Sequence, residues 1–311
     1  MNGNSISRPR VDLGGYTVIP LWFGCNNDCC LCMLAGMRQH LPPIGFDRFC
    51  EVVTGLRRQG RCRNLILSGA EVTTLDDLFR YVEFAASLEW FDRIQIQTNG
   101  RRLSDHAYLS GLVARGVNEF FVSIHGTETV HDAITRRPGS YRQTMQGIRN
   151  LAGQDANLIS NTVMTTANQD DLETLLAILS AEAISEFHLW NFFPMRAQDR
   201  VELIVPLNRV VEQLPRLREM LGPGPRPLVL KGFPHCLPAP AGVVFDSRFP
   251  ETILPKAFWE AFDESRFGAC PHRQQCADRL CWGLSGAYRE QFGDERQRLQ
   301  PLPEKDRNHE G

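Results

Sequence analysis

The chain has 311 residues, of which 42% are hydrophobic, and its formal net charge is −2, so it is long and apolar enough for one barrel-like domain of about 200 to 250 residues with an extension. The near-zero charge provides no overall basic field for nucleic acid, and no segment approaches the roughly 20 apolar residues of a membrane helix. Ten cysteines, together with a polar start that lacks the apolar core of an export signal, predict a reducing, cytoplasmic location.

Residues 16–205 alternate short β-branched runs with longer stretches of helical periodicity, after a start at 1–15 that is expected to be disordered. This alternation is typical of parallel strands linked by crossover helices. It predicts an α/β fold, a partial (β/α)6 barrel of the TIM type, with its chemistry where the strands end. The expected strands are 16–23, 63–68, 93–98, 118–124, 157–165 and 186–192, and the expected helices are 46–59, 75–89, 104–115, 141–153 and 168–182.

Cys25, Cys29 and Cys32 lie within eight residues, directly after the first expected strand. Thiolates at this spacing can bind three irons of a four-iron cluster and leave the fourth iron open to a small chelating molecule. Structural zinc, the main alternative, usually takes two separated pairs of ligands. Cys30 is a poorer ligand than Cys29, since its use would leave a single residue between neighbouring ligands. The motif favours iron–sulfur over zinc or incidental cysteines.

The motif Cys-x3-Cys-x2-Cys, with Leu31 before its last cysteine, resembles the signature of the radical S-adenosylmethionine (radical SAM) enzymes. The resemblance implies a [4Fe-4S] cluster whose open iron chelates the amino and carboxylate groups of S-adenosylmethionine (SAM). It also implies an electron donor of the flavodoxin or ferredoxin type. Reductive cleavage would then give methionine and a 5′-deoxyadenosyl radical that abstracts a substrate hydrogen. In the family the position of Leu31 is often aromatic and lies against the adenine.

Small and polar residues follow the next expected strands. Gly69, Ala70 and Glu71 match the family's Gly-Gly-Glu segment, which implies that they hold the methionine amino group of SAM. The small residues would let the backbone approach a ligand, and the carboxylate is expected to point into the mouth of the barrel. By the same resemblance Ser123 and His125 lie near the ribose and the methionine carboxylate. The alternatives are an ordinary strand-to-helix turn at Glu71 and a packing role for His125.

Other residues near the strand ends are weaker candidates. Packing is an equally good interpretation for four polar residues on the fifth and sixth strands, Asn161, Thr165, His188 and Asn191. His131 lies in a loop after the fourth strand that could cover the site, and Arg136 or Arg137 in that loop could pair with the methionine carboxylate, although a solvated charge is the simpler interpretation. The barrel core is expected to contain the aromatic group Phe187, Trp190, Phe192 and Phe193.

Proline-rich and glycine-rich stretches after residue 205 indicate the end of the regular repetition and the start of an extension over 206–290. The extension contains enough thiolates to complete a cluster, namely Cys236, Cys270, Cys276 and Cys281. Its ending, Cys276-x4-Cys281-Trp282, resembles the SPASM and twitch extensions of radical SAM enzymes, which implies an auxiliary [4Fe-4S] cluster. Zinc remains open, since four cysteines are also its preferred structural set. The tail 291–311 is expected to be disordered.

The resemblance specifies radical generation better than it specifies the substrate. Radical SAM enzymes with auxiliary clusters commonly oxidise or cross-link residues of ribosomal peptides, so oxidative modification or maturation of a peptide is the first expectation. The second is radical chemistry on a small molecule in cofactor or natural-product biosynthesis. The non-enzyme alternative is an iron–sulfur or zinc scaffold or electron carrier. No catalytic acid or base is identified, because hydrogen abstraction needs positioning of the C–H bond more than proton transfer. Neither nucleic acid nor a membrane is an expected partner.

Overall fold

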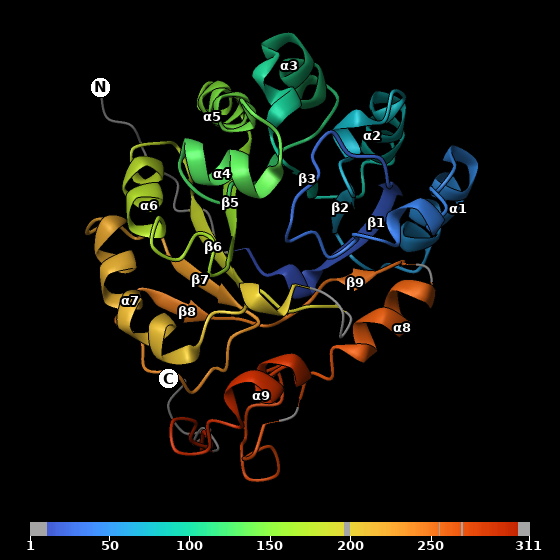
Figure 1. The fold of residues 1–311 in the computed structure, drawn as a ribbon. Coiled ribbons are helices and arrows are strands. Elements are labelled where there is room, and N and C mark those ends of the chain that lie inside the picture. The colour runs from blue at the N-terminus through green and yellow to red at the C-terminus, as the bar shows by residue number, and fades with distance from the viewer. Residues whose placement is uncertain (1–10, 196–199, 255, 269, 304–311) are drawn as a thin grey trace, which may run out of the picture.

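The computed structural model describes residues 11–195, 200–254, 256–268 and 270–303. In this part of the chain nine strands form one sheet in the order β8-β7-β6-β5-β4-β3-β2-β1-β9, and neighbouring strands are parallel. Figure 1 shows the sheet curving into a partial barrel with helices around its outside. The strands are β1 (Tyr16–Trp22), β2 (Asn64–Gly69), β3 (Arg93–Thr98), β4 (Glu119–Ser123), β5 (Asn157–Met164), β6 (Glu186–Asn191), β7 (Leu228–Lys231), β8 (Val243–Phe245) and β9 (Glu251–Thr252).

Helices connect the successive long strands, as crossovers between parallel strands require. In α1 the side chains of Phe49, Val53 and Leu56 recur at helical spacing and are buried. They join strand residues such as Ile19 and Leu67 in the main hydrophobic core. The helices are α1 (Phe46–Arg58), α2 (Leu78–Ser87), α3 (His106–Ala114), α4 (Glu128–Thr135), α5 (Ser140–Leu151), α6 (Leu172–Ser180), α7 (Leu207–Met220), α8 (Lys256–Glu264) and α9 (Gly286–Phe292).

The six expected strands and five expected helices are present at the predicted places, and the α/β partial-barrel class is confirmed. The structure adds three short strands after residue 205, which the sequence pattern does not predict. β7 and β8 continue the sheet from β6, and β9 pairs with β1 at the opposite edge. These strands have four, three and two residues, too few for a periodic signal. Residues beyond 205 therefore contribute to the same sheet as the barrel.

The segments expected to be disordered lie partly outside the described residues, at 1–10 and 304–311. In their described parts, Val11, Leu13 and Leu299 are buried, and Leu299 belongs to the main core. Both ends of the described chain thus contribute apolar side chains to the interior. Among the described residues, no helix has the length and the apolar character needed to cross a membrane.

Candidate functional site

Two adjoining cavities open at the carboxyl ends of the strands. One, of about 210 Å³, is lined by Cys25, Cys29 and Cys32, and we call it the cysteine cavity. The other, of about 310 Å³, is lined mainly by apolar side chains, and we call it the apolar cavity. The residues that line both are Leu31, Cys32, Gly69, Gln97, Phe121, Ser123, His125 and Asn161. The cavities lie where a parallel barrel is expected to carry its chemistry.

The loop that carries the three cysteines is held in place by hydrogen bonds from several directions. The N–H groups of Asp28 and Cys30 donate to the last two carbonyls of α4, at 3.0 and 2.9 Å. Arg101, just after β3, donates to Oδ1 of Asn27 at 2.8 Å and to a neighbouring carbonyl of the loop. The half-exposed guanidinium of Arg136 lies 3.7 Å from the Asp28 carboxylate. The thiol positions therefore depend on the ends of β3 and α4 as well as on β1.

The chemistry of the three thiols fits a four-iron cluster. Burial raises the pKa of Cys25, Cys29 and Cys32. At Cys29, nearby Cys32 and Cys25 raise it further, because thiolates so close together repel one another. Iron bound directly to the sulfurs would offset both the burial of the thiolates and their mutual repulsion, since metal ligation favours the thiolate. Cys30 is not among the described residues that line either cavity, which favours Cys29 as the ligand.

Gly69 and Ala70 line the cysteine cavity at the end of β2. Gly69 has φ +140°, and a Cβ there would lie 1.9 Å from the carbonyl oxygen of Trp22. Only glycine allows this approach. The N–H of Ala70 donates to the same carbonyl at 2.8 Å, so backbone hydrogen bonding between β1 and β2 continues past Gly69. Glycine is thus required here for the close approach of β1 and β2, which places Gly69 and Ala70 at the wall of the cysteine cavity.

The Glu71 side chain does not point into the mouth of the barrel, contrary to the expectation from sequence. Its carboxylate accepts hydrogen bonds from Thr73, from the Thr98 hydroxyl at 2.6 Å and from the N–H of Asn99 at 2.6 Å. The side chain is buried, and burial raises its pKa while these donors oppose the rise. A buried carboxylate is stable only where donors surround it, and these donors come from Thr73, two residues on, and from Thr98 and Asn99 at the end of β3. Glu71 is not among the described residues that line either cavity.

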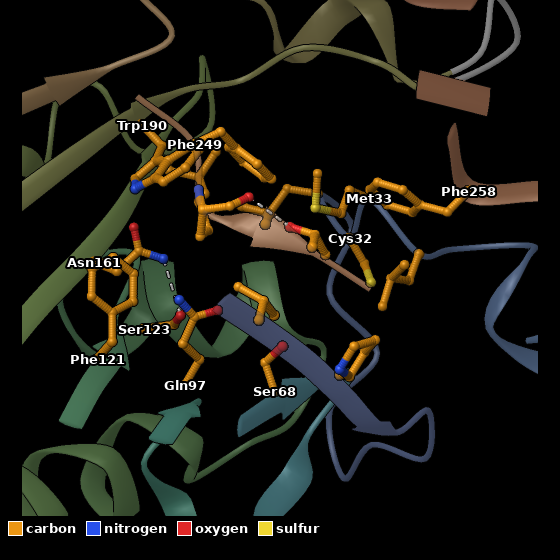
Figure 2. Close-up of a pocket in the computed structure, with 18 of the residues that line it drawn as sticks. Cys32, Met33, Ser68, Gln97, Phe121, Ser123, Asn161, Trp190, Phe249 and Phe258 are labelled. Carbon is orange, nitrogen blue, oxygen red and sulfur yellow. Dashed lines mark hydrogen bonds between the residues drawn. The ribbon is translucent and has the colours of Figure 1, made fainter. Parts of the chain in front are cut away.

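Ser123 and His125 line both cavities after β4. The Ser123 hydroxyl accepts a hydrogen bond from Nδ2 of Asn161 at 3.2 Å, and Figure 2 shows this pair beside Gln97. Nδ1 of His125 accepts from the N–H of Val163 at 3.3 Å, so the neutral ring carries its proton on Nε2. Burial lowers the pKa of His125 to about 3, which keeps the ring neutral. Both residues are therefore placed to donate or accept hydrogen bonds at the junction of the cavities.

His131, which is expected in a loop that could cover the site, lies instead in α4 and lines the cysteine cavity. Its Nδ1 accepts from the N–H of His125 at 3.0 Å, so its proton lies on Nε2. Burial lowers its pKa to about 4, and Nε2 is buried without a hydrogen-bond partner in the described residues. An unpaired buried donor costs free energy unless a ligand accepts from it.

Among the described residues, two of the four weaker polar candidates on β5, β6 and the residues after them line a cavity and two do not. Asn161 and Asn191 line the apolar cavity, whereas Thr165 and His188 are not among the described residues that line either cavity. Thr165 is fully buried behind the end of β5. His188 is buried inside the barrel, where its Nε2 lies 3.1 Å from Oε2 of Glu186. Packing is therefore the better interpretation for Thr165 and His188.

The sequence predicts a core position for four aromatic residues of β6 and the loop after it, and three of the four are buried in hydrophobic clusters. Phe187 and Phe192 are buried in the main core and Phe193 is buried in a second hydrophobic cluster, but Phe192, Phe193 and the partly buried Trp190 also line the apolar cavity. Hydrophobic pattern alone cannot separate these two environments, because a core face and a cavity wall are both apolar. Trp190 packs against Phe249 with ring centroids 6.3 Å apart, and Figure 2 shows both rings at one wall of the cavity.

The four cysteines of the 206–290 region lie near one another. Burial raises the pKa of Cys236, and nearby Cys270 and Cys276 also raise it, while Cys236 contributes to the raised pKa of Cys281. Backbone N–H groups donate to the sulfurs of Cys276 and Cys281 at 3.3 to 3.4 Å, which favours the thiolate. This set fits a second group of thiolate ligands.

Within the described ranges, no three His, Cys, Asp or Glu side chains meet closely enough to hold one metal ion. A four-iron cluster places each thiolate on a different iron, so its ligands lie farther apart than the ligands of one ion.

Residues 19–179, just over half of the chain, match the family described as the radical SAM superfamily. The sporulation killing factor maturation protein SkfB of Bacillus subtilis (strain 168) is 22% identical over 152 residues, which cover 49% of this chain and 36% of SkfB. Streptococcus suis SuiB bound to its precursor peptide SuiA is similar in structure, with TM-score 0.54 and 15% identity over 66% of this chain and 44% of SuiB. The structure of anSMEcpe with bound AdoMet has TM-score 0.56 and 14% identity over 66% of this chain and 59% of that protein. The chain thus matches 36 to 59% of the length of these relatives.

Proposed function

The chain belongs to the radical SAM superfamily, and we propose that it carries out oxidative modification or maturation of a peptide. Members of this superfamily are enzymes that bind SAM at a [4Fe-4S] cluster. Two similarities support a peptide substrate: the similarity to SuiB, whose structure holds a precursor peptide, and the similarity to SkfB, a maturation protein. The apolar cavity beside the cysteines is large enough to receive a side chain of such a peptide.

In this proposal Cys25, Cys29 and Cys32 hold the [4Fe-4S] cluster and leave one iron for SAM. When bound, the reduced cluster would give one electron to SAM, whose C5′–S bond would break to leave methionine and a 5′-deoxyadenosyl radical able to abstract a hydrogen atom from the substrate. An external flavodoxin or ferredoxin provides the electron. The observation that carries the proposal is that the three thiols line one cavity, and that this cavity shares a wall with a second, larger one. A radical formed there would lie next to its substrate.

The strand-end residues would bind and orient SAM. Gly69 and Ala70 offer backbone groups to the methionine amino group, and Ser123 and His125 offer polar groups to the ribose and the carboxylate. His131 adds the unpaired Nε2–H described above. Glu71, the third residue of the Gly-Gly-Glu match, acts through Asn99, because its carboxylate binds the Asn99 N–H and does not line the cavity. It is a positioning residue in this proposal.

The second cysteine set, in the extension over 206–290, would hold one auxiliary [4Fe-4S] cluster, as in SPASM and twitch proteins. The mutual effects of these thiols on pKa and their backbone N–H donors support the assignment. An auxiliary cluster can accept an electron from an oxidised substrate radical, whereas zinc would only brace the fold. Iron analysis separates the two. About eight irons per chain would support two clusters, and about four irons with one zinc would make this site structural.

The test of the main proposal is the release of 5′-deoxyadenosine by protein that has been reconstituted with iron and sulfide without oxygen and then reduced. We expect release from the unaltered chain and from Cys30→Ala, because Cys30 lines neither cavity among the described residues. We expect no release from Cys29→Ala, which removes a thiolate of the proposed set. Full release from Cys29→Ala, or loss from Cys30→Ala instead, would overturn the ligand assignment.

A further inference from the structure

The apolar cavity is lined without any Asp, Glu, Lys or Arg among the described residues. Apart from Cys32, whose sulfur the proposed cluster would take up, its polar side chains are neutral amides and hydroxyls, including Gln97, Asn161 and Asn191, together with His125, which burial keeps neutral. A charged side chain placed there would lose its water and, among the described lining residues, would find no Asp, Glu, Lys or Arg to pair with. The cavity wall therefore discriminates against charged groups.

The rim of the cavity is apolar even where it meets solvent. Met33 and Phe249 both line the cavity and are 40% and 36% exposed, which is unusual for side chains of this size. Figure 2 shows Met33 and Phe258 on one side of the cavity, opposite Trp190 and Phe249. Exposed apolar side chains that surround a cavity are typical of a surface that another apolar group covers. Methionine and aromatic rings also adapt to different apolar partners.

We propose that the apolar cavity binds an uncharged, apolar side chain of the substrate peptide, aliphatic or aromatic, and that Met33 and Phe249 contact it at the rim. This inference rests on the proposed function and names the class of side chain presented to the cysteine cavity. The amides of Gln97 and Asn161, at the wall shared by the two cavities, are left to bind the polar backbone of the peptide. A cavity of about 310 Å³ holds one side chain and its adjoining backbone.

The test uses four capped amino acids as probes: the N-acetyl amides of phenylalanine, leucine, lysine and glutamate. Saturation-transfer NMR on the reconstituted, unreduced protein measures their binding. We expect signals from the phenylalanine and leucine probes that exceed those from the lysine and glutamate probes by about tenfold, the effect of 1.4 kcal/mol. Equal signals from all four probes, or stronger signals from the charged ones, would overturn the inference. This comparison needs only the unaltered chain.

Two matched variants locate the binding. Phe249→Asp places a charge at the rim and is expected to weaken the phenylalanine signal about tenfold. Val201→Asp places the same charge at a residue that is 39% exposed and is not among the described residues lining the cavity, so the signal should stay within twofold. Equal losses in both variants would overturn the assignment to this cavity. Release of 5′-deoxyadenosine without substrate is recorded in parallel, so that failure of the radical chemistry is distinguished from failure of this inference.

Discussion

The carboxylate of Glu71 accepts a hydrogen bond from the backbone N–H of Asn99 at 2.6 Å, and this bond links the end of β2 to the end of β3. Asn99 lines the cysteine cavity, and its Nδ2 donates to Oδ1 of Asn26 in the cysteine loop at 2.7 Å. A chain of two hydrogen bonds therefore runs from a buried carboxylate to the segment that carries the proposed cluster ligands. Glu71 can shape the cavity without touching what binds there.

Glu71→Gln tests this role. The amide would lose the charge that Thr73, Thr98 and Asn99 surround and would present an NH₂ group to donors. Hydrogen bonds to a buried charge contribute about 1.5 to 3 kcal/mol, so we expect a loss of roughly 2 kcal/mol in the free energy of unfolding, measured in urea. Glu128→Gln, a substitution at a half-exposed surface ion pair, is the control and should change stability by less than about 0.5 kcal/mol. Full stability together with lost SAM binding would indicate direct contact between Glu71 and SAM.

Gly69→Ala tests the close approach of β1 and β2. Its Cβ would lie 1.9 Å from the Trp22 carbonyl oxygen, at a φ of +140° that alanine rarely adopts. We expect a loss of at least about 2 kcal/mol in the free energy of unfolding. Gly55→Ala, inside α1 with open space around it, should instead stabilise the protein by about 0.5 to 1 kcal/mol. Thermal or urea unfolding of the pair measures both, and a stable Gly69→Ala variant would show that the strand ends can separate.

Arg101→Lys tests how the cysteine loop is held. The guanidinium donates to Asn27 and to a loop carbonyl from one side and to Gln143 from the other, which an ammonium group cannot reproduce. A loss of about 1 kcal/mol in loop stability corresponds to roughly fivefold more frequent opening. We expect a chelator to remove iron about fivefold faster from the reconstituted variant. Arg142→Lys, at a side chain 78% exposed, is the control, and equal rates in both variants would contradict this role.

The parts of the fold and site that could be read from sequence are those with local signals. The spacing of Cys25, Cys29 and Cys32 is contained in eight residues, and the long strands and helices have clear periodicity. The orientation of Glu71 could not be predicted, because two of its donors, Thr98 and Asn99, lie at the end of a strand that begins 22 residues later. β9 was missed because its two residues become a strand only by pairing with β1. The orientation of Glu71 and the formation of β9 both depend on residues that are distant in the sequence.

Non-local packing also explains why the sequence does not show which aromatic side chains line the apolar cavity. Phe187 and Trp190 lie on one short strand, yet one is buried in the core and the other lines the apolar cavity. Which of the two environments a side chain enters depends on whether a distant segment fills the space above it. Phe249, 59 positions after Trp190 in the chain, packs against that ring but leaves the space beyond it open.

His188 gives a prediction for the pH dependence of stability. The ring is buried inside the barrel, and burial lowers its pKa below the ordinary 6.5 even though Glu186 opposes the shift. Above about pH 6.5 the ring is neutral in both the folded and the unfolded chain. As the pH falls below that value, the unfolded chain takes up a proton that the folded chain does not, so stability is lost by about 1.4 kcal/mol per pH unit from this residue.

His188→Gln removes this contribution and should therefore lose less stability between pH 7.5 and 5.5 than the unaltered chain. Urea unfolding at both pH values, with equal metal loading, measures the difference, which should reach roughly 1 kcal/mol over this range because the unfolded histidine is protonated only below about pH 6.5. His40→Gln, at an exposed position, is the matched control. If His188→Gln loses as much stability between pH 7.5 and 5.5 as the unaltered chain, the prediction is contradicted. That result would mean that His188 takes up a proton in the folded barrel, with Glu186 as its partner.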